Sequence, residues 1–437
     1  MKTIRNLYFI ILFLTSFNLM AQETEWTLEA CIQYMLEQDF SLKEIELNSE
    51  IQQQEVIASY GRLLPNASLY ADHQYNFGSV IDPSTNARIS SDIQSNVLNF
   101  SSQLELFNWG NFVRIHSAKL EREKVAYNLE VAKNEAIIQV VKAFMQVQFN
   151  QEQVDLLENQ LKNTKSTLER MEQEFELGNK SKSDLYELIA NKTAEEQQLT
   201  LAKNNLKSAK TDLLNLLNID NEVTFVFHDT TIEPQLMASV SELYDEGVKN
   251  RPELKAAELE KQLAKKSIQE QRSAFLPRLY ADYAFSSFYV DVEKLPLRQQ
   301  FKNNKTHYIG LSISIPIFNR LQTRTSVQKA KVAHTQSKLK EQQQKQAYYN
   351  ALREVHTETQ NALDTWEAAK KNLAAQEVSF DKTEHKFLLG MIDAYGYFAA
   401  KNNFLSAQTD VLQAKYTYQY QNVLLNFYVT NEIGLNN

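Results

Sequence analysis

The sequence contains little of what most globular domains use to turn and to crosslink. Only 9 glycines and 7 prolines occur in 437 residues, and no proline lies between Pro83 and Pro234 or after Pro316. Because glycine and proline end helices and shape turns, so few of them predict long uninterrupted helices. Cys31 is the single cysteine, which excludes an internal disulfide and predicts a small buried side chain.

Long hydrophobic segments and clusters of positive charge are also missing. After the first 20 residues no apolar run is long enough for a transmembrane helix. The net charge is −8, and no dense Lys/Arg stripe alternates with aromatic residues, which argues against binding to nucleic acid. The seven histidines show no paired metal spacing and no glycine-rich phosphate loop occurs. We therefore predict a protein that is not an enzyme and needs no cofactor or metal.

The N-terminus has the pattern of an export signal. Lys2 and Arg5 precede a short apolar run that ends in Met20-Ala21-Gln22. A charged start, an apolar centre and small residues before the cut are typical of a secretory signal peptide, which we predict over residues 1–21. Cys31 lies well beyond this site and does not fit a lipid-anchored N-terminus.

Two apolar columns at seven-residue spacing predict a helical hairpin. The first column is Val140, Val147, Val154, Leu161, Leu168 and Phe175. The second is Leu185, Lys192, Leu199, Leu206 and Leu213, in which only Lys192 is not apolar. A strict period of seven keeps one helix face on its partner through a left-handed supercoil. We therefore predict a coiled-coil-like hairpin that turns at Gly178.

The same hairpin recurs 212 residues later in the sequence. The shifted columns are Leu352, Thr359, Trp366, Leu373, Phe380 and Phe387, then Tyr397, Phe404, Val411, Tyr418 and Leu425. The turn Leu177-Gly178 has its counterpart in Leu389-Gly390, and Leu64-Pro65 has its counterpart in Leu276-Pro277. The chain is a tandem duplication. We predict a first repeat over residues 22–238 and a second over 239–437, intertwined in one domain.

Each repeat also contains two segments in which apolar and polar residues alternate. These segments cover residues 66–78 and 93–107 in the first repeat, and 278–290 and 306–318 in the second. A period of two predicts β-strands with one apolar and one polar face. In the clearest segment, Ile309 and Leu311 alternate with Gly310 and Ser312.

Strand length and alternation together favour an outer-membrane β-barrel, because a tilted strand of roughly 9 to 11 residues spans a membrane. We expect the apolar faces to contact lipid through Leu69, Leu104, Leu279, Ile309, Leu311, Ile313 and Ile315, and Leu106 continues the series in the second strand. A half-buried sheet of a soluble protein gives the same alternation, but the export signal favours the barrel. Four strands cannot close, so two or three protomers are needed.

Phe175-Glu176-Leu177-Gly178, followed by Asp184-Leu185, and the start of the first helix at Trp26-Thr27-Leu28 carry a resemblance to a known family. The mature chain resembles the TolC-type outer-membrane efflux factor family. The resemblance implies a mainly α channel-tunnel with β-strands, in which three identical protomers share an outer-membrane β-barrel and a periplasmic α-barrel of long helices. It implies the outer-membrane channel of a tripartite efflux or type I secretion system, with a periplasmic adaptor and an inner-membrane transporter as partners.

The resemblance also implies that both hairpin turns lie at the periplasmic mouth. It implies adaptor docking at Gly178, Asn179, Lys180, Lys182, Asp184, Leu185 and Gly390. We expect Asp393 and Tyr395 to narrow the pore, since three carboxylates near one axis would favour cations. Tyr397 is expected to lie in the heptad seam instead. Gly396 stands where the first repeat has Asp184 (184 + 212), so an acidic constriction cannot be carried over to that position.

Two other functions stay open on the sequence alone. An exported coiled-coil scaffold or adhesin would use the long helices but has no need for four alternating strands in two pairs. The adaptor of the same pumps would have one hairpin rather than two equivalent ones. Neither the cargo nor the partner pump is readable from the sequence, and pore formation by the purified protein separates the channel from the scaffold.

Overall fold

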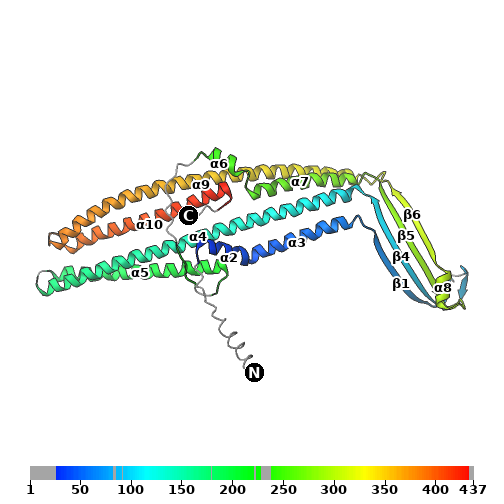
Figure 1. The fold of residues 1–437 in the computed structure, drawn as a ribbon, viewed down its shortest axis with the longest axis horizontal. Coiled ribbons are helices and arrows are strands. Elements are labelled where there is room, and N and C mark those ends of the chain that lie inside the picture. Colours follow the sequence, from blue (N-terminus) through cyan, green and yellow to red (C-terminus); the bar gives the residue numbers. More distant parts are fainter. Residues whose placement is uncertain are drawn as a thin grey trace, which may run out of the picture. The chain divides into compact units, whose positions relative to one another are not determined.

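A computed structural model describes the chain over residues 26–81, 85–90, 92–178, 180–220, 223–227 and 238–432 (Figure 1). The predicted signal peptide over residues 1–21 and Asn179 of the first hairpin turn lie outside the described residues. The chain is mainly α-helical, with a smaller number of β-strands.

The two halves of the chain have the same order of main elements. In the first half they are α2 (Leu28–Gln38), α3 (Phe40–Gly61), β1 (Asn66–Asn76), β4 (Ile93–Phe107), α4 (Trp109–Glu176) and α5 (Lys182–Leu217). In the second half they are α6 (Val240–Gly247), α7 (Pro252–Ser273), β5 (Arg278–Val290), β6 (Thr306–Ser314), α9 (Gln322–Leu388) and α10 (Ala394–Thr430). The segments between paired strands add β2 (Ser79–Ile81), β3 (Arg88–Ser90) and α8 (Leu297–Asn303).

Local caps explain where the short helices begin and end. The Thr27 hydroxyl accepts a hydrogen bond from the Ala30 N–H at 3.3 Å and so begins α2. The Asp39 carboxylate accepts one from the Leu42 N–H at 2.8 Å, which separates α2 from α3. α7 begins at Pro252, because proline has no N–H to donate and its fixed φ suits the first turn of a helix.

Contacts divide the chain into two compact units, and each unit takes residues from both repeats. The hairpin unit comprises Met1–Lys43, Glu130–Arg251 and Gln346–Asn437, and the sheet unit comprises Glu44–Leu129 and Pro252–Lys345. The repeat boundary near residue 238 therefore does not separate the compact units, since each of them is assembled from corresponding pieces of both repeats.

The sheet unit contains one four-stranded antiparallel sheet in the order β1-β4-β5-β6. Its two central strands come from different repeats, with Phe100 of β4 opposite Phe285 of β5. β1 and β6 form the two edges, and over the part of the chain that is described neither pairs with a further strand on its outer side. The sheet is therefore open at both edges.

The pairing register places six of the predicted apolar residues on one face of this sheet. They are Leu69, Leu104, Leu279, Ile309, Leu311 and Ile313. Leu104 lies opposite Ala281, which in turn lies opposite Leu311, so the three strands present a continuous apolar row. Ile309 and Leu311 are 82% and 74% exposed, which is unusual for large aliphatic side chains.

A β-bulge changes the predicted alternation at the end of β4. The register shifts between Glu105 and Phe107, so that Phe107 rather than Leu106 pairs with Leu279. A bulge inserts one extra residue opposite a single partner and reverses the facing of the residues after it. The prediction that Leu106 continues the apolar series was therefore wrong.

Two strands end earlier than predicted. β6 stops at Ser314 rather than at 318, because Pro316 has no N–H for the ladder, and Ile315 therefore lies just after the strand. β1 stops at Asn76 rather than at 78, where Gly78 takes a φ of +96° that no strand residue adopts. β4 and β5 have the predicted ends.

In the hairpin unit, α4 runs beside α5 and α9 runs beside α10 (Figure 1). The heptad columns lie at the helix contacts, where Val140, Val147 and Leu213 are fully buried. Thr359 is also fully buried although it is polar, because its hydroxyl donates a hydrogen bond to the Val355 carbonyl at 2.7 Å. An apolar repeat of seven residues predicts that these side chains are buried between helices, as the structure shows.

Candidate functional site

Two glycines turn the chain at the ends of the hairpins, which we call the first and second tips. Gly178 and Gly390 have φ of +80° and +73°, a region in which any other side chain is strained. Ser181 caps α5 by accepting a hydrogen bond from an N–H of the first turn at 3.1 Å. Asp393 caps α10 in the same way at 3.0 Å. Each predicted turn is therefore a tight turn closed by a helix cap.

Side chains of the first tip bind both helix ends of the second tip. The Lys180 ammonium lies 3.5 Å from the Phe387 carbonyl oxygen in the last turn of α9, and 5.1 Å from the Phe387 ring centre. The Asp184 carboxylate accepts a hydrogen bond from the Ala394 N–H at the start of α10, at 3.4 Å. A cation at a helix C-terminus and an anion at a helix N-terminus both complement the helix dipole.

An apolar cluster joins the two hairpins directly behind the tips. Met171 and Leu188 of the first hairpin pack with Phe387 and Tyr397 of the second. The rings of Phe387 and Tyr397 stack at 4.5 Å between centres. Burial raises the pKa of Tyr397 to about 12, with the nearby Glu384 charge adding to the effect. Tyr397 thus lies in the seam, as expected from its heptad position.

The other residues predicted at the tips differ in their exposure and in the groups that they contact. Leu185 is partly buried and packs against the apolar cluster behind the tips. Lys182 lies over the ring of Tyr186 on its own helix, at 5.5 Å. Tyr395 is 71% exposed, whereas the Asp393 carboxylate is engaged in capping α10. The structure therefore brings Lys180 and Asp184 together with the second tip and leaves Lys182 outside that contact.

The tips also expose apolar side chains that the sequence prediction did not include. They are Leu177 on the first tip and Leu388, Leu389 and Met391 on the second. Leu177 and Leu389 each directly precede a turn glycine and fall outside the heptad columns, which is a signal that the sequence does contain. Exposed apolar side chains at a chain reversal are typical of a surface that contacts a partner.

A buried polar cluster links three helices of the hairpin unit. Lys401 of α10 is 3% exposed, and its ammonium lies 2.8 Å from the carboxylate of Glu195 on α5. Both groups also hydrogen-bond to the Thr164 hydroxyl on α4. Burial lowers the pKa of Lys401, although the hydrogen bond and the charge of Glu195 act in the opposite direction. The neighbouring sequence does not predict this cluster, because Lys and Glu are common on solvated helix faces.

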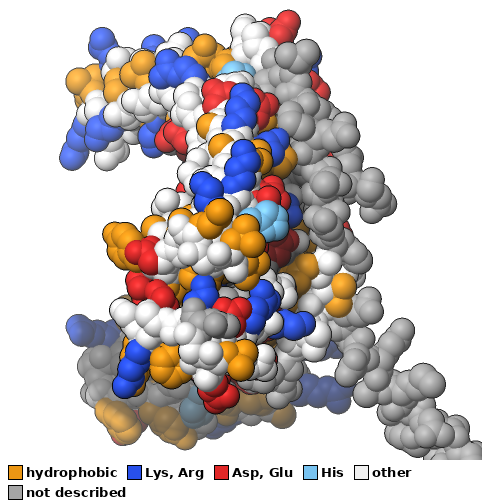
Figure 2. All heavy atoms as spheres, turned by 90° about the vertical axis from the view of Figure 1, so that its left-hand side faces the viewer, with side chains coloured by type: hydrophobic (Ala, Val, Ile, Leu, Met, Phe, Trp, Pro, Cys, Tyr) orange, Lys and Arg blue, Asp and Glu red, His pale blue; other side chains and the backbone are white. Residues whose placement is uncertain are grey.

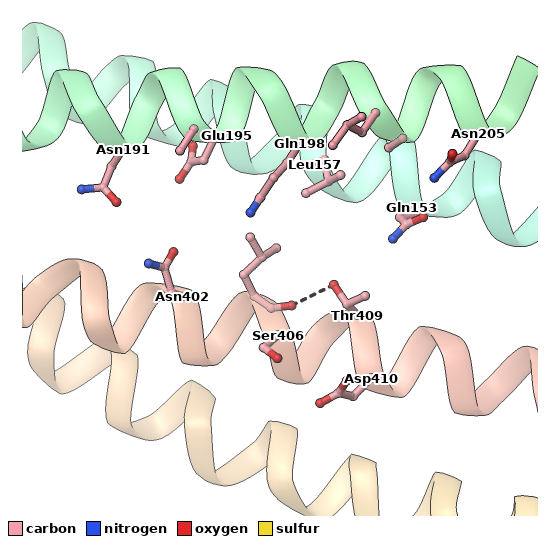
Figure 3. Close-up of a pocket in the computed structure, with 14 residues that line it drawn as sticks. Gln153, Leu157, Asn191, Glu195, Gln198, Asn205, Asn402, Ser406, Thr409 and Asp410 are labelled. Atoms are coloured by element: carbon pink, nitrogen blue, oxygen red, sulfur yellow. Dashed lines mark hydrogen bonds between the residues drawn. The ribbon is translucent and has the colours of Figure 1, made fainter.

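Beside this cluster a polar groove runs between α5 and α10 (Figure 3). Its volume is about 610 Å³, and Gln153 and Leu157 of α4 also line it. Asn191 on α5 and Asn402 on α10 point toward one another across the groove. Glu195 lines the groove as well, so the buried cluster lies at its wall.

Figure 2 looks at the molecule from the left-hand side of Figure 1, where the hairpins end. Charged and hydrophobic side chains are mixed on this face. Lys and Arg side chains alternate there with Asp, Glu and hydrophobic ones (Figure 2). No helix among the described residues combines the length and hydropathy that crossing a membrane requires. In those same residues, no three His, Cys, Asp or Glu side chains converge in a way that could hold a metal ion.

Two long helical hairpins and a four-stranded antiparallel sheet, built by duplication, form the fold of TolC-like channel-tunnels. Superposition on the solved structure of CusC, whose crystal structures concern folding and transmembrane channel formation, gives a TM-score of 0.78 at 14% identity. The match covers 92% of this chain and 91% of that one. At this identity the similarity shows the fold.

The chain belongs to the family described as outer membrane efflux protein. The family model matches residues 31–218 and 243–429, one stretch in each half of the chain. The outer membrane protein TolC of Vibrio cholerae is 21% identical over 369 residues, 83% of this chain and 81% of TolC. The alkaline protease secretion protein AprF of Pseudomonas aeruginosa is 20% identical over 340 residues, 77% of this chain and 70% of AprF.

These similarities identify an outer-membrane protein that extends into the periplasm and belongs to a family of channels rather than enzymes. The resemblance to the TolC-type family, drawn from the turn motifs and the duplication, is confirmed. The predicted location in the outer membrane is confirmed as well.

Proposed function

We propose that this protein is a homotrimeric channel through which a tripartite efflux or type I secretion system passes its cargo to the exterior. The observation that supports this most is the sheet, which is open at both edges over the described residues and apolar on one face. In lipid an unpaired strand edge is very costly, so a membrane sheet must close. Barrels start at about eight strands, and three copies of a four-stranded sheet supply twelve (3 × 4).

In such a barrel the apolar face contacts lipid and the opposite face lines the lumen. The lipid-facing residues are Leu69, Leu104, Leu279, Ile309, Leu311 and Ile313, with Ile315 just beyond the strand. The other face carries groups that water can solvate, among them Gln103, Asp282 and Ser312. Gln103 donates a hydrogen bond to Asp282 at 2.8 Å, so neighbouring strands are joined on the polar face as well.

In the periplasm, the tips form the contact surface for an adaptor, and through the adaptor the channel meets an inner-membrane transporter. The surface comprises the two turns at Gly178 and Gly390, the exposed Lys182, and the exposed Leu177 and Leu389. Lys180 and Asp184 serve it indirectly by holding the second tip against the first. Met391 is exposed and belongs to the same surface, whereas Leu185 supports it from behind by packing against the apolar cluster.

The pore constriction is assigned to Asp393 and Tyr395 of the second tip. Tyr395 is 71% exposed and therefore free to contribute bulk in a lumen. One oxygen of the Asp393 carboxylate caps α10 by accepting a hydrogen bond from the Gly396 N–H. Three such carboxylates around a threefold axis would favour cations over anions.

The proposal is tested by mass and conductance measurements on the purified protein. We expect three times the protomer mass in detergent and discrete conductance steps in planar lipid bilayers. A scaffold or adhesin with the same helices would give no conductance steps. A stable monomer in detergent that leaves the bilayer resistance unchanged would overturn the channel proposal.

A further inference from the structure

A polar pocket of about 440 Å³ lies at the end of the sheet where the helices join it, entirely within the sheet unit. It is bounded by three junctions, where α3 leads into β1, β4 leads into α4 and α7 leads into β5. Figure 1 shows these junctions at the same end of the sheet. Arg62, Arg114 and Arg278 line the pocket, one from each junction. Three cationic side chains therefore border one cavity.

The pocket opens on the polar face of the sheet. Arg278 and Asp282 lie on the same face of β5, and Asp282 lies opposite Gln103 of β4, which also lines the pocket. Asn66 of β1 lies opposite Gln103 and is another lining residue. The apolar residue Leu279 follows Arg278 in β5 and points to the other face. A ligand therefore reaches this pocket from the lumen of the proposed channel rather than from lipid.

Two of the three arginine charges are not neutralised by the protein. Arg62 and Arg278 are exposed, and among the described residues neither guanidinium has a hydrogen-bond or ion-pair partner. Arg114 differs, because its guanidinium lies 2.7 Å from the Glu270 carboxylate. The pocket thus offers two arginine side chains whose donors are available to a ligand.

The acidic side chain in the pocket is already engaged. Glu105 is the one acid among the described residues that line it, and its carboxylate accepts hydrogen bonds from the side-chain amides of Asn108 and Asn111. Next to them α4 begins at Trp109, so the first turn of a 68-residue helix also borders the pocket. The N-terminal end of a helix carries a partial positive charge. The pocket therefore keeps an excess of positive charge.

The sequence duplication shows that the junctions fold without these two arginines. Arg62 corresponds to Ala274 (62 + 212), and Arg278 corresponds to Asn66 (278 − 212). Asn66 and Arg278 each begin a strand directly after a Leu-Pro pair, so the same turn forms with a neutral side chain. Exposed charges of this kind also contribute little to stability. The two arginines are therefore better explained by a ligand than by folding.

We propose that this pocket binds an oxyanion, the carboxylate, phosphate or sulfate group of a cargo molecule, through Arg62 and Arg278. This inference rests on the proposed channel function, because the lumen brings the cargo to the polar face. A guanidinium binds such a group through two parallel N–H donors. The site is separate from the constriction proposed at Asp393, which belongs to the hairpin unit.

The test measures binding of inorganic tripolyphosphate to the full-length protein in detergent by isothermal titration calorimetry. Arg62→Gln and Arg278→Gln each remove one charge, and the double variant removes both. Arg278→Lys keeps the charge but loses the paired donors. The control is Arg353→Gln, which removes an exposed arginine of α9 in the hairpin unit and so changes the net charge equally.

The native cysteine shows whether each variant is folded. Cys31 is fully buried, and burial and the Glu29 charge raise its pKa to about 12, so maleimide should label it only after unfolding. A second measurement uses planar bilayers, in which the tripolyphosphate concentration that halves the channel current is determined for each variant.

We expect each single Gln variant to weaken tripolyphosphate binding about threefold to fivefold, as for other exposed charge pairs, and the double variant about tenfold or more. Arg278→Lys should lie between the wild type and Arg278→Gln, and Arg353→Gln should match the wild type. The half-blocking concentration should rise in the same order, with Cys31 protected throughout. Equal binding by the wild type and the double variant would overturn the anion site. If the wild type formed no pores but binding followed this pattern, the channel proposal would fail and the anion site would stand.

Discussion

The ammonium nitrogen of Lys180 lies 3.5 Å from the carbonyl oxygen of Phe387, so that the first tip caps the C-terminal end of α9 in the second hairpin. Asp184 completes the arrangement at the N-terminal end of α10 through the Ala394 N–H. Two charges of opposite sign on one tip thus match the two helix ends of the other. The second tip is positioned by electrostatics as well as by the apolar cluster behind it.

Lys180→Ala should loosen the second tip without unfolding the protein. A charge at an exposed helix end contributes roughly 0.3 to 1 kcal/mol, so amide exchange around Gly390 should become about two to five times faster. Hydrogen exchange with mass spectrometry of the second-tip peptide measures this change. Lys182→Ala is the matched control, because Lys182 contacts Tyr186 on its own helix instead. Equal exchange in the two variants would contradict the capping role of Lys180.

Much of this architecture could be predicted because it depends on local periodicity. Apolar residues seven positions apart, such as Val140 and Val147, predict a buried helix face. Apolar residues two positions apart, such as Ile309 and Leu311, predict one face of a strand. Gly178 could be identified as the turn residue because a tight turn after a long helix needs a residue in the left-handed backbone conformation. These features are determined by residues a few positions apart.

Features that depend on distant residues could not be predicted in the same way. Lys401 and Glu195 lie 206 residues apart, and nothing next to either of them distinguishes it from a solvated helix residue. Lys180 and Asp184 were predicted to contact an adaptor, because a polar turn indicates exposure to solvent. The residues around them in the sequence do not reveal that they contact the second tip instead. The bulge at Leu106 arises from pairing with β5 of the other repeat, which the alternation within β4 does not reveal.

The facing of the sheet predicts different responses to charge on its two sides. Leu311→Lys places a cation on the apolar face and, near the middle of the bilayer, should cost about 2 to 4 kcal/mol of barrel stability. Ser312→Lys places the same cation on the opposite face and should change mainly the conductance. Denaturant titration of both variants in lipid vesicles measures the difference in their unfolding free energies. Equal loss of stability would show that the apolar face does not contact lipid.

The buried hydroxyl of Tyr397 predicts a loss of stability in alkali. Its pKa is raised to about 12 in the folded protein, mainly by burial, so the folded state keeps the proton while the unfolded chain releases it near pH 10. This contribution, about 2 to 3 kcal/mol for a shift of two pKa units, is complete below pH 10 and is lost between pH 10 and 12.

Thermal unfolding at pH 9 and pH 11.5 measures this effect. Tyr397→Phe cannot ionise, so its unfolding temperature should fall less between the two pH values than that of the wild type. Tyr395→Phe is the control, because the Tyr395 ring is 71% exposed. An identical fall in Tyr397→Phe and the wild type would mean that the hydroxyl is accessible to water in the folded protein.

The last prediction separates the charge of Asp393 from its role as a helix cap. Asp393→Asn removes the charge but keeps a side-chain oxygen for the Gly396 N–H, whereas Asp393→Ala removes both and should cost about 1 kcal/mol of helix stability. If three Asp393 carboxylates lie around the pore axis, single-channel recordings should show reduced cation preference in both variants. Tyr395→Ala removes an exposed ring without a charge and should raise conductance while leaving ion preference intact. Wild-type selectivity in Asp393→Asn together with wild-type conductance in Tyr395→Ala would place the constriction away from the second tip, and Asp393 would then serve α10 only as its cap.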